Sequence, residues 1–346
     1  GMLMFTLLIG LFVLYSASGQ SIDKVGAQFV NILAAFAVLW VAANIPPQHL
    51  ERIALPLYML GLILLIGVTL FGEVSHGARR WLSLGVGRVQ PSELMRIAVP
   101  MLLAWYFATR EASLRLPDYV VGVLLLAVPV ALIIKQPDLG TAILIASSGF
   151  FVLFFAGLSV RLLLGITLTG GVLAPVLWSF MHDYQRKRIE ILFDPYQDPL
   201  GAGYHTIQAS IALGSGGIAG KGWLHGTQAQ LDFLPERTTD FIFAVFGEEF
   251  GLLGILLLLV LFGLIIARGL VIASEAQNTF CRLLAGSITL TFFTYVFVNI
   301  GMVSGILPVV GVPLPLISYG GTSLVTLMLG FGILMSIQTH KKLVTS

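Results

Sequence analysis

Acidic side chains at the start of an apolar segment, or inside one, are the residues that first suggest chemistry. Asp240 follows two threonines and directly precedes a long apolar segment. A carboxylate at a water–lipid boundary can take a proton from a hydroxyl group, and it can equally cap the first turn of a helix. Glu248 and Glu249 lie deeper in the same segment. An acidic side chain is costly there and is by default a functional candidate, the alternative being a pair with a buried arginine such as Arg96.

Basic residues that could bind phosphate lie in three segments between the apolar ones. They are Arg79 and Arg80, the run Arg186, Lys187 and Arg188, and the lone Lys221. Guanidinium groups bind phosphate through two parallel hydrogen bonds, so together these side chains would suit a pyrophosphate or a lipid phosphate. The run at 186–188 could equally contact anionic lipid headgroups.

The glycine-rich segment 214–222 includes Lys221 but does not have the spacing of a P-loop. That motif requires glycine where Ser215 stands, and serine or threonine where Gly222 stands. Two interpretations stay open. The segment is either a glycine turn that lets a phosphate approach Lys221, or a plain turn.

A second pair of charges begins another apolar segment. Glu93 and Arg96 are three residues apart, which places them on one face of a helix. They predict either a structural ion pair or a pair that faces a substrate cavity. Asp138 follows a proline at the start of the next segment but one, and we expect it to cap that helix.

The elements that must position these residues are membrane helices. The chain has 346 residues, of which 57% are hydrophobic and 10% charged, whereas soluble domains average about 25% charged residues. A spanning helix needs about 20 mostly apolar residues. Ten segments meet this need, so we expect an all-α polytopic protein with one transmembrane domain, 1–346. The predicted spans are 2–18, 26–45, 52–71, 93–109, 118–135, 139–157, 161–181, 241–267, 280–304 and 319–338.

Topology follows from the number of spans and the positions of the basic residues. Ten spans place both termini on one side, and an excess of Lys and Arg there makes that side cytoplasmic. The first span is expected to be a true helix, because no basic segment precedes it. Three polar or irregular segments then lie on the opposite side: 72–92, the large loop 182–240, and 306–321, in which three prolines exclude an ordinary helix.

Composition also excludes several classes of protein. A net charge of +2 offers no basic face for nucleic acid, and a single cysteine, Cys281, excludes an internal disulfide or a thiolate metal cluster. The six histidines do not have the spacing of a zinc site. Residues Tyr204, Ile207 and Ile211 recur at helical spacing within the large loop, which predicts a helix lying in the membrane interface.

Several segments together resemble a known family. They occur in one order along the chain, from about residue 14 to its end: Gln90–Glu93, Gln136–Thr141, Asp194–Tyr204, Gly220–Gly222, Leu234–Glu236, Thr239–Phe243 and Gly311–Gly321. This series is similar to the SEDS family (shape, elongation, division and sporulation). The segments Met181–Arg186 and Trp223–Gln228 look like those of its elongation members rather than its division members.

The resemblance implies a ten-helix peptidoglycan glycosyltransferase of the bacterial cytoplasmic (inner) membrane. Such a protein joins lipid II into glycan strands, and its partners are a class B penicillin-binding protein and other membrane proteins of the elongation complex. It implies no organic cofactor. The essential aspartate of the family corresponds to Asp240, and its acid–base pair corresponds to Glu93 and Arg96. Other matched or cavity positions are Trp81, Arg79, Arg80, Lys221, Arg186, Arg188, Asp138, Glu248 and Ser318.

The expected mechanism uses two lipid-linked sugars in an extracytoplasmic cavity. Asp240 would remove or orient the proton of the acceptor 4-hydroxyl group as this attacks the anomeric carbon of the strand carried on undecaprenyl pyrophosphate. Arg79, Arg80, Lys221 or a divalent cation (Mg²⁺ or Mn²⁺) would stabilise the departing pyrophosphate. Many relatives have lysine at the position of Arg96, and a guanidinium cannot donate its proton as lysine does.

Two other functions stay open. A lipid II flippase would carry the headgroup across the membrane, although transporters tend to have internal repeats and polar residues near the midplane, and neither pattern is visible. A scaffold without activity would hold the penicillin-binding protein, and for it Asp240 and Glu93 would be dispensable.

Overall fold

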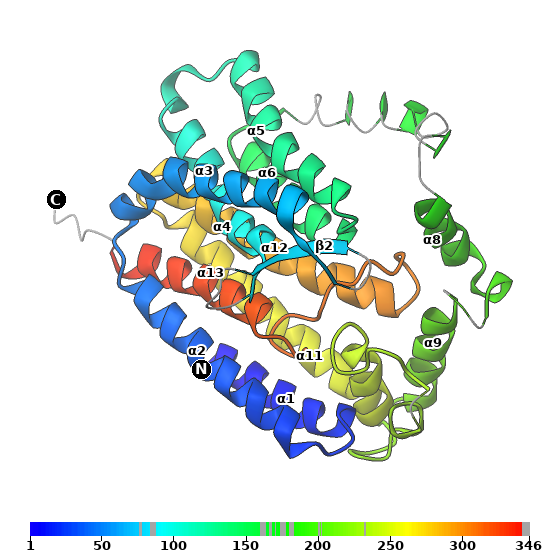
Figure 1. Cartoon of the computed structure of the whole chain (residues 1–346). Helices are drawn as coiled ribbons and strands as arrows, with labels where there is room; N and C mark the ends of the chain where they lie inside the picture. The colour runs from blue at the N-terminus through cyan, green and yellow to red at the C-terminus, as the bar shows by residue number, and fades with distance from the viewer. Residues whose placement is uncertain are drawn as a thin grey trace. The chain divides into compact units, whose positions relative to one another are not determined.

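The structure is a computed structural model of the whole chain (Figure 1). The residues that it describes are 1–75, 78–83, 88–159, 164–165, 168–169, 171–173, 178–179, 183–199, 201, 203–231 and 233–340. The chain divides into two compact units. Unit 1 comprises Gly1–Ala27, Leu158–Gly263 and Tyr295–Tyr319, and unit 2 comprises Gln28–Gly157, Leu264–Thr294 and Gly320–Ser346.

Unit 2 is built around one buried helix, α4 (Pro91–Ala108). Its neighbours in the bundle are α3 (Pro47–Phe71), α5 (Leu116–Lys135), α6 (Leu139–Phe155) and α13 (Thr322–Thr339). Figure 1 shows α3, α4 and α6 close together. Because protein surrounds α4, it can carry Glu93 and Arg96 in its first turns. This position accounts for the low hydropathy of the predicted span at 93–109.

Helix starts in unit 2 follow ordinary capping chemistry. Proline occupies the first turn of α3, α4 and α5, where its missing N–H costs nothing. Asp138 caps α6 as predicted, because its carboxylate accepts from Thr141 N at 3.2 Å. A short 3-10 helix, η1 (Glu111–Ser113), joins α4 to α5.

A small antiparallel sheet lies between α3 and α4, and the sequence analysis did not predict it. Its strands are β1 (Glu73–Ser75), β2 (Ala78–Ser83) and β3 (Arg88–Val89), in the order β1-β2-β3. Trp81 pairs with Glu73 in the first ladder, and Leu82 pairs with Val89 in the second. The expected all-α fold therefore holds for the described residues apart from this sheet.

Unit 1 holds α1 (Met2–Ala17) and the helices of the segment expected as the large loop. These helices are α8 (Asp183–Phe193), η2 (Pro195–Gln197), α9 (Tyr204–Gly216) and α10 (Thr227–Gln230). Trp223 stacks on Phe12 of α1 with 4.1 Å between ring centroids. The helix predicted at Tyr204–Ile211 is confirmed as part of α9.

Three long helices have residues in both units: α2 (Ile22–Ala43), α11 (Ile242–Ser274) and α12 (Thr279–Val303). Residues 304–319, between α12 and α13, form no helix, as the prolines predicted. We call this segment the proline loop.

The predicted spans agree with helices at nine of ten places, and the tenth, 161–181, lies mostly outside the described residues. Among the described helices, six are long and apolar enough to cross a membrane by length and composition: α2, α3, α5, α11, α12 and α13. Helices α1 and α6 are apolar but shorter. That all ten segments cross the membrane remains a prediction.

Helix α11 is interrupted at Gly251, whose φ of 62° and ψ of −163° are not helical. Residues 217–222 are inserted at this break and replace the hydrogen bonds that the helix loses. The four bonds are Lys221 N to Glu248 O, Gly222 N to Glu249 O, Leu252 N to Gly217 O and Leu253 N to Ile218 O, at 3.0–3.1 Å. These four bonds pair the two carbonyls and two amides that the break in the helix leaves open, as buried or membrane-embedded polypeptide requires.

Candidate functional site

Asp240 lies in unit 1, two residues before α11 begins. Hydrogen bonds to three successive backbone carbonyls, those of residues 238–240, hold it in place. The bonds are Tyr319 N to Thr238 O at 2.9 Å, Ser318 Oγ to Thr239 O at 2.6 Å, and Asn299 Nδ2 to Asp240 O at 2.8 Å. All three donors come from α12 or the proline loop. Because three consecutive peptide groups are fixed, the backbone position from which the Asp240 side chain extends is fixed as well.

The side chain of Asp240 extends over the proline loop. A Cβ atom built on Gly311 would lie 3.4 Å from Asp240 Oδ2, and Gly311 has a φ of 73°. Glycine is favoured here because L side chains rarely adopt this backbone region. Ser318 also accepts from Leu314 N at 2.8 Å, so it ties the loop to itself and to Thr239.

Asn299 is a site residue that sequence reasoning missed. It is fully buried, and its Nδ2 donates both to Asp240 O and to Val312 O at 2.7 Å. It thereby joins α12, the segment before α11 and the proline loop. An amide inside the apolar span 280–304 was the available signal, since a polar side chain in such a helix is costly.

Lys221 and Glu248 form an ion pair inside unit 1. Lys221 Nζ lies 2.7 Å from Glu248 Oε1 and 2.8 Å from Thr227 Oγ1. Glu248 is fully buried and also accepts from Gln228 N. The pair suggested for Glu248 with Arg96 is not what forms, and the ammonium of Lys221 is bonded within the protein.

Glu249 points toward α1, where Ser16 Oγ donates to its Oε1. Its other oxygen, Oε2, has no hydrogen-bond partner among the described residues. Both adjacent glutamates are therefore held by residues far away in the sequence. Their arrangement connects the break in α11 to α1 and to the glycine-rich segment.

The second charged pair forms in unit 2, on α4. Arg96 Nη1 lies 2.7 Å from Glu93 Oε2, and Arg96 Nη2 donates to Thr141 Oγ1 at 3.2 Å. Thr141 N in turn donates to the capping carboxylate of Asp138. The structure thus brings together three of the predicted residues across α4 and α6.

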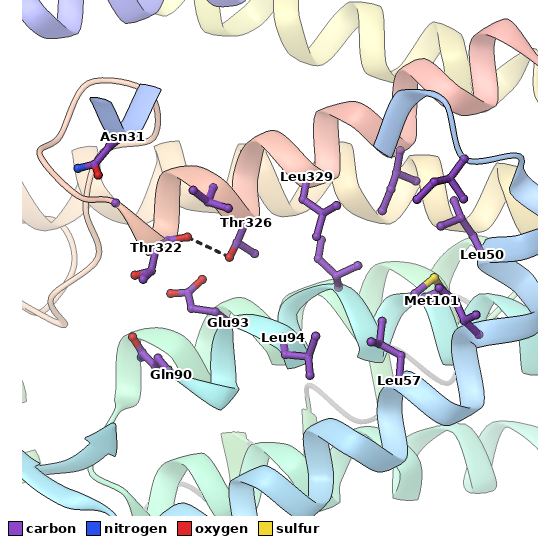
Figure 2. Close-up of a pocket in the computed structure, with 16 residues that line it drawn as sticks. Asn31, Leu50, Leu57, Gln90, Glu93, Leu94, Met101, Thr322, Thr326 and Leu329 are labelled. Carbon is purple, nitrogen blue, oxygen red and sulfur yellow. Dashed lines mark hydrogen bonds between the residues drawn. The ribbon is translucent and has the colours of Figure 1, made fainter. Parts of the chain in front are cut away.

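A groove of about 610 Å³ opens beside Glu93, lined entirely by residues of unit 2 (Figure 2). One end is polar. Asn31, Gln90, Glu93, Thr322 and Thr326 lie there, and Thr326 Oγ1 donates to Thr322 O at 3.0 Å.

The rest of the groove is apolar. Its lining here includes Leu50, Leu57, Leu94, Met101 and Leu329. A long space with a polar end beside a carboxylate and hydrocarbon walls matches an amphiphile with a polar head and an apolar tail.

Other predicted residues are placed in the backbone only, or beside structural partners. Arg79 and Arg80 are on β2, but their side chains, like that of Arg188, lie outside the described residues. Trp81 is half-buried on the same strand. Arg186 Nε donates to Trp178 O at 3.0 Å and its Nη2 to Ser179 O at 2.8 Å.

The described residues contain no group of three or more His, Cys, Asp or Glu side chains arranged to hold an ion. Mg²⁺ often binds through one or two carboxylates together with substrate phosphates, so the divalent cation expected with the pyrophosphate remains a proposal.

The chain is similar to known proteins over nearly its whole length. The model of the family described as "Cell cycle protein" (FtsW, RodA, SpoVE) matches residues 1–343. "Peptidoglycan glycosyltransferase MrdB" of Escherichia coli strain K12 is 55% identical over 334 residues, covering 96% of this chain and 90% of that protein. "Probable peptidoglycan glycosyltransferase FtsW" of Geobacter metallireducens is 35% identical, covering 96% and 92%.

Solved structures agree with the sequence comparisons. A chain from work on "structural coordination of polymerization and crosslinking by a peptidoglycan synthase complex" superposes with a TM-score of 0.85 at 31% identity, covering 98% of this chain and 96% of that one. The crystal structure of the rod shape determining protein RodA of Thermus thermophilus gives a TM-score of 0.73 at 29% identity, covering 97% and 94%. Fold, motifs and relatives agree, and the chain therefore belongs to the FtsW, RodA and SpoVE family of cell cycle proteins, the SEDS family.

Proposed function

We infer that this membrane protein is a peptidoglycan glycosyltransferase that joins lipid II units into β-1,4 glycan strands during cell elongation. The names of its relatives support the reaction, and the higher identity to MrdB than to FtsW supports the elongation branch. The main support for the site is the fixed backbone position of Asp240. Its own carbonyl and the two before it accept hydrogen bonds from α12 and the proline loop.

Asp240 acts as the general base in this proposal. Its carboxylate removes the proton from the acceptor 4-hydroxyl group while the hydroxyl oxygen attacks the donor anomeric carbon and the bond to the pyrophosphate oxygen breaks. Direct displacement inverts the configuration at that carbon. It needs no covalent glycosyl-enzyme and no second nucleophilic carboxylate. Positioned general bases typically contribute about 10²–10⁴-fold to the rate.

The departing undecaprenyl pyrophosphate must be stabilised as its charge develops. Arg79 and Arg80 on β2 are the proposed contacts, because guanidinium groups suit phosphate. Lys221 is a weaker candidate, since Glu248 lies 2.7 Å from its ammonium. A divalent cation bound with the pyrophosphate itself remains compatible with this proposal.

The groove in unit 2 supports a lipid-linked substrate. Its hydrocarbon walls suit a polyprenyl chain, and Glu93 with its neighbours at the polar end suits the first polar groups of the head. Arg96 holds Glu93 by an ion pair at 2.7 Å, so its proposed role is to orient that carboxylate. A proton-donating role is not assigned to it.

The proposed cellular setting rests on the family and on the number of spans with their bias of basic residues. The protein lies in the bacterial cytoplasmic membrane, with both termini in the cytoplasm. It works with a class B penicillin-binding protein that cross-links the strands, together with other elongation proteins. The matched synthase complex, described by its polymerization and crosslinking, supports this partnership.

Polymerisation of labelled lipid II in proteoliposomes tests the proposal. The protein is reconstituted with its penicillin-binding partner, whose transpeptidase serine is blocked, and the products are separated as glycan ladders. Asp240→Asn should abolish the ladders. Asp23→Asn, at an exposed position in the first turn of α2, is the matched control and should leave them unchanged.

Each alternative function has its own outcome in this assay. Lipid II that appears on the opposite leaflet without any ladder would indicate a flippase. A scaffold would form no ladders even as the wild type. In that case both Asp240→Asn and Glu93→Gln would still bind the penicillin-binding partner as the wild type does. Ladders formed at the wild-type rate by folded Asp240→Asn would refute the assignment of the base.

A further inference from the structure

A small pocket in unit 1 is lined by α8, α9 and the proline loop. Its volume is about 230 Å³. The walls are Ile191 and Leu192 of α8, His205 and Thr206 of α9, and Leu307–Val309 of the proline loop. Pockets for whole ligands usually measure about 300–1,000 Å³. This one is suited to a single substituent of a larger substrate.

Two independent connections link the walls of the pocket to the residues around Asp240. The imidazole of His205 stacks on the ring of Phe241, the residue after Asp240, with 5.6 Å between centroids and 16° between planes. The wall Leu307–Val309 continues within two residues to Gly311, against which Asp240 Oδ2 lies. A substituent in the pocket would therefore belong to a sugar whose hydroxyl group can reach Asp240.

His205 is the main polar group of this pocket. Its Nδ1 is buried and has no hydrogen-bond partner among the described residues. A buried N–H without a partner is more costly than an unpaired acceptor. The favoured tautomer thus carries its proton on Nε2, which makes this nitrogen the donor of the half-buried ring. Burial also lowers the pKa of His205, with Glu236 acting in the opposite direction, and this keeps the ring neutral.

These features define the chemistry of the missing group. It must offer a hydrogen-bond acceptor to the neutral imidazole, beside the hydroxyl-bearing Thr206, and a small apolar surface for the walls from α8 and the proline loop. It must carry no charge, because the described lining offers neither a cation nor an anion. An acetamido group combines a carbonyl oxygen and a methyl group within this size.

We propose that the His205 pocket receives the 2-acetamido group of an N-acetylated amino sugar, with His205 Nε2–H donating to its carbonyl oxygen. This inference rests on the proposed function, since peptidoglycan is built from such sugars. It adds a specificity-determining residue to that reaction. His205 selects the substrate by binding it and takes no part in proton transfer.

The experiment compares kcat/KM for lipid II with kcat/KM for analogues that carry a free amine in place of the acetamido group, on one sugar at a time. The wild type should prefer the N-acetylated substrate. In His205→Leu this preference should fall by about tenfold, the value of one hydrogen bond of about 1.4 kcal/mol. His205→Gln, which keeps an N–H donor, should retain most of it. The sugar whose analogue shows the loss is the one that occupies the pocket.

A second variant tests the pocket without removing the donor. Val309→Phe should fill the space and lower kcat/KM for the N-acetylated substrate more than for the amine analogue. Thermal unfolding shows which variants are folded. Equal preference ratios in the wild type, His205→Leu and Val309→Phe would overturn this inference while ladders still form. Absence of ladders from the wild type would instead be a failure of the proposed function.

Discussion

At the scale of single residues, the candidate site depends on polar side chains that hydrogen-bond to backbone groups in place of water. Asn299 is the clearest case, because one amide group satisfies the carbonyls of Asp240 and Val312 at 2.8 and 2.7 Å. Neither carbonyl lies in a helix or strand, so no backbone N–H of a regular element replaces the lost donor. The position of the proposed base thus depends on a side chain 59 residues further along the chain.

Asn299→Ala should therefore reduce both stability and activity. It leaves one buried and one part-buried acceptor without this donor, and an unsatisfied buried group costs about 1–3 kcal/mol. Asn44→Ala is the control, since Asn44 is exposed and its side chain donates to a carbonyl of the preceding helix, α2. Thermal unfolding and the ladder assay would measure the two effects. Equal unfolding temperatures for the two variants would contradict the role given to Asn299.

His205 predicts a dependence of stability on pH. Burial lowers its pKa in the folded protein below 6.5, with Glu236 opposing this. Well above pH 6.5 the imidazole is neutral in both the folded and the unfolded state, so it does not affect the free energy of unfolding there. As the pH falls below 6.5, the unfolded chain takes up the proton first, so the free energy of unfolding decreases. His205→Gln should make unfolding temperatures between pH 5 and 7 less dependent on pH than in the wild type, and identical slopes would exclude this contribution.

At the scale of elements, the break in α11 is the main departure from regular structure. Two carbonyls and two amides that a continuous helix would pair with each other are paired with residues 217–222 instead. Glycine is needed where the two backbones meet. A Cβ atom on Gly220 would overlap Glu249 O, and Gly220 also has a φ of 81°. The glycine-rich segment is thus neither a P-loop nor a plain turn, because it completes another element.

Gly220→Ala should destabilise the protein by more than about 1 kcal/mol, since it combines strain at positive φ with a clash against backbone. Gly214→Ala provides a matched control in the same segment, because a Cβ atom there meets no other atom within 4 Å. The measurement is the unfolding temperature of each variant in one detergent. A loss as large for Gly214→Ala as for Gly220→Ala would show that glycine content alone matters.

At the scale of the whole molecule, each unit presents one part of the proposed chemistry. Unit 1 holds Asp240 with the His205 pocket, and unit 2 holds Glu93 at the end of the apolar groove. Helix α4 contributes Glu93, Leu94, Ile97 and Met101 to the lining of the groove. Its charged residues lie inside the protein, so a chain this rich in apolar residues can contain them.

Narrowing the groove should impair the use of a lipid-linked substrate. Leu57→Trp places a larger side chain in the groove wall, whereas Leu55→Trp makes the same change on the same helix at an exposed position. We expect a higher KM for lipid II in the first variant and an unchanged KM in the second. A short-chain lipid II analogue should be affected less by Leu57→Trp than the full-length lipid. Equal effects on both lipids would argue against a prenyl chain in this groove.

The sequence by itself determined the class of the protein and most of its helices. Lipid leaves a backbone no hydrogen-bond partners, so apolar segments of sufficient length predict helices, and the prolines at 308–315 predict a break. Capping chemistry was equally local, and Asp138 was placed correctly. Asp240 and Glu93 stood out because charge is costly beside apolar segments. The small sheet of β1, β2 and β3 was missed because two of its strands have only three and two residues, and the third does not alternate between apolar and polar side chains.

Only the tertiary structure decided which distant groups meet. Lys221 pairs with Glu248 across 27 residues, and Ser16 reaches Glu249 across 233. A sequence shows that a buried charge needs a partner, but many lysines, arginines and hydroxyl groups satisfy that need equally well. The choice among them depends on how helices pack and where a backbone breaks, and those depend on many contacts at once. For this reason the chemistry of single residues was predictable here, while Asn299, the His205 pocket and the true partner of Lys221 were not.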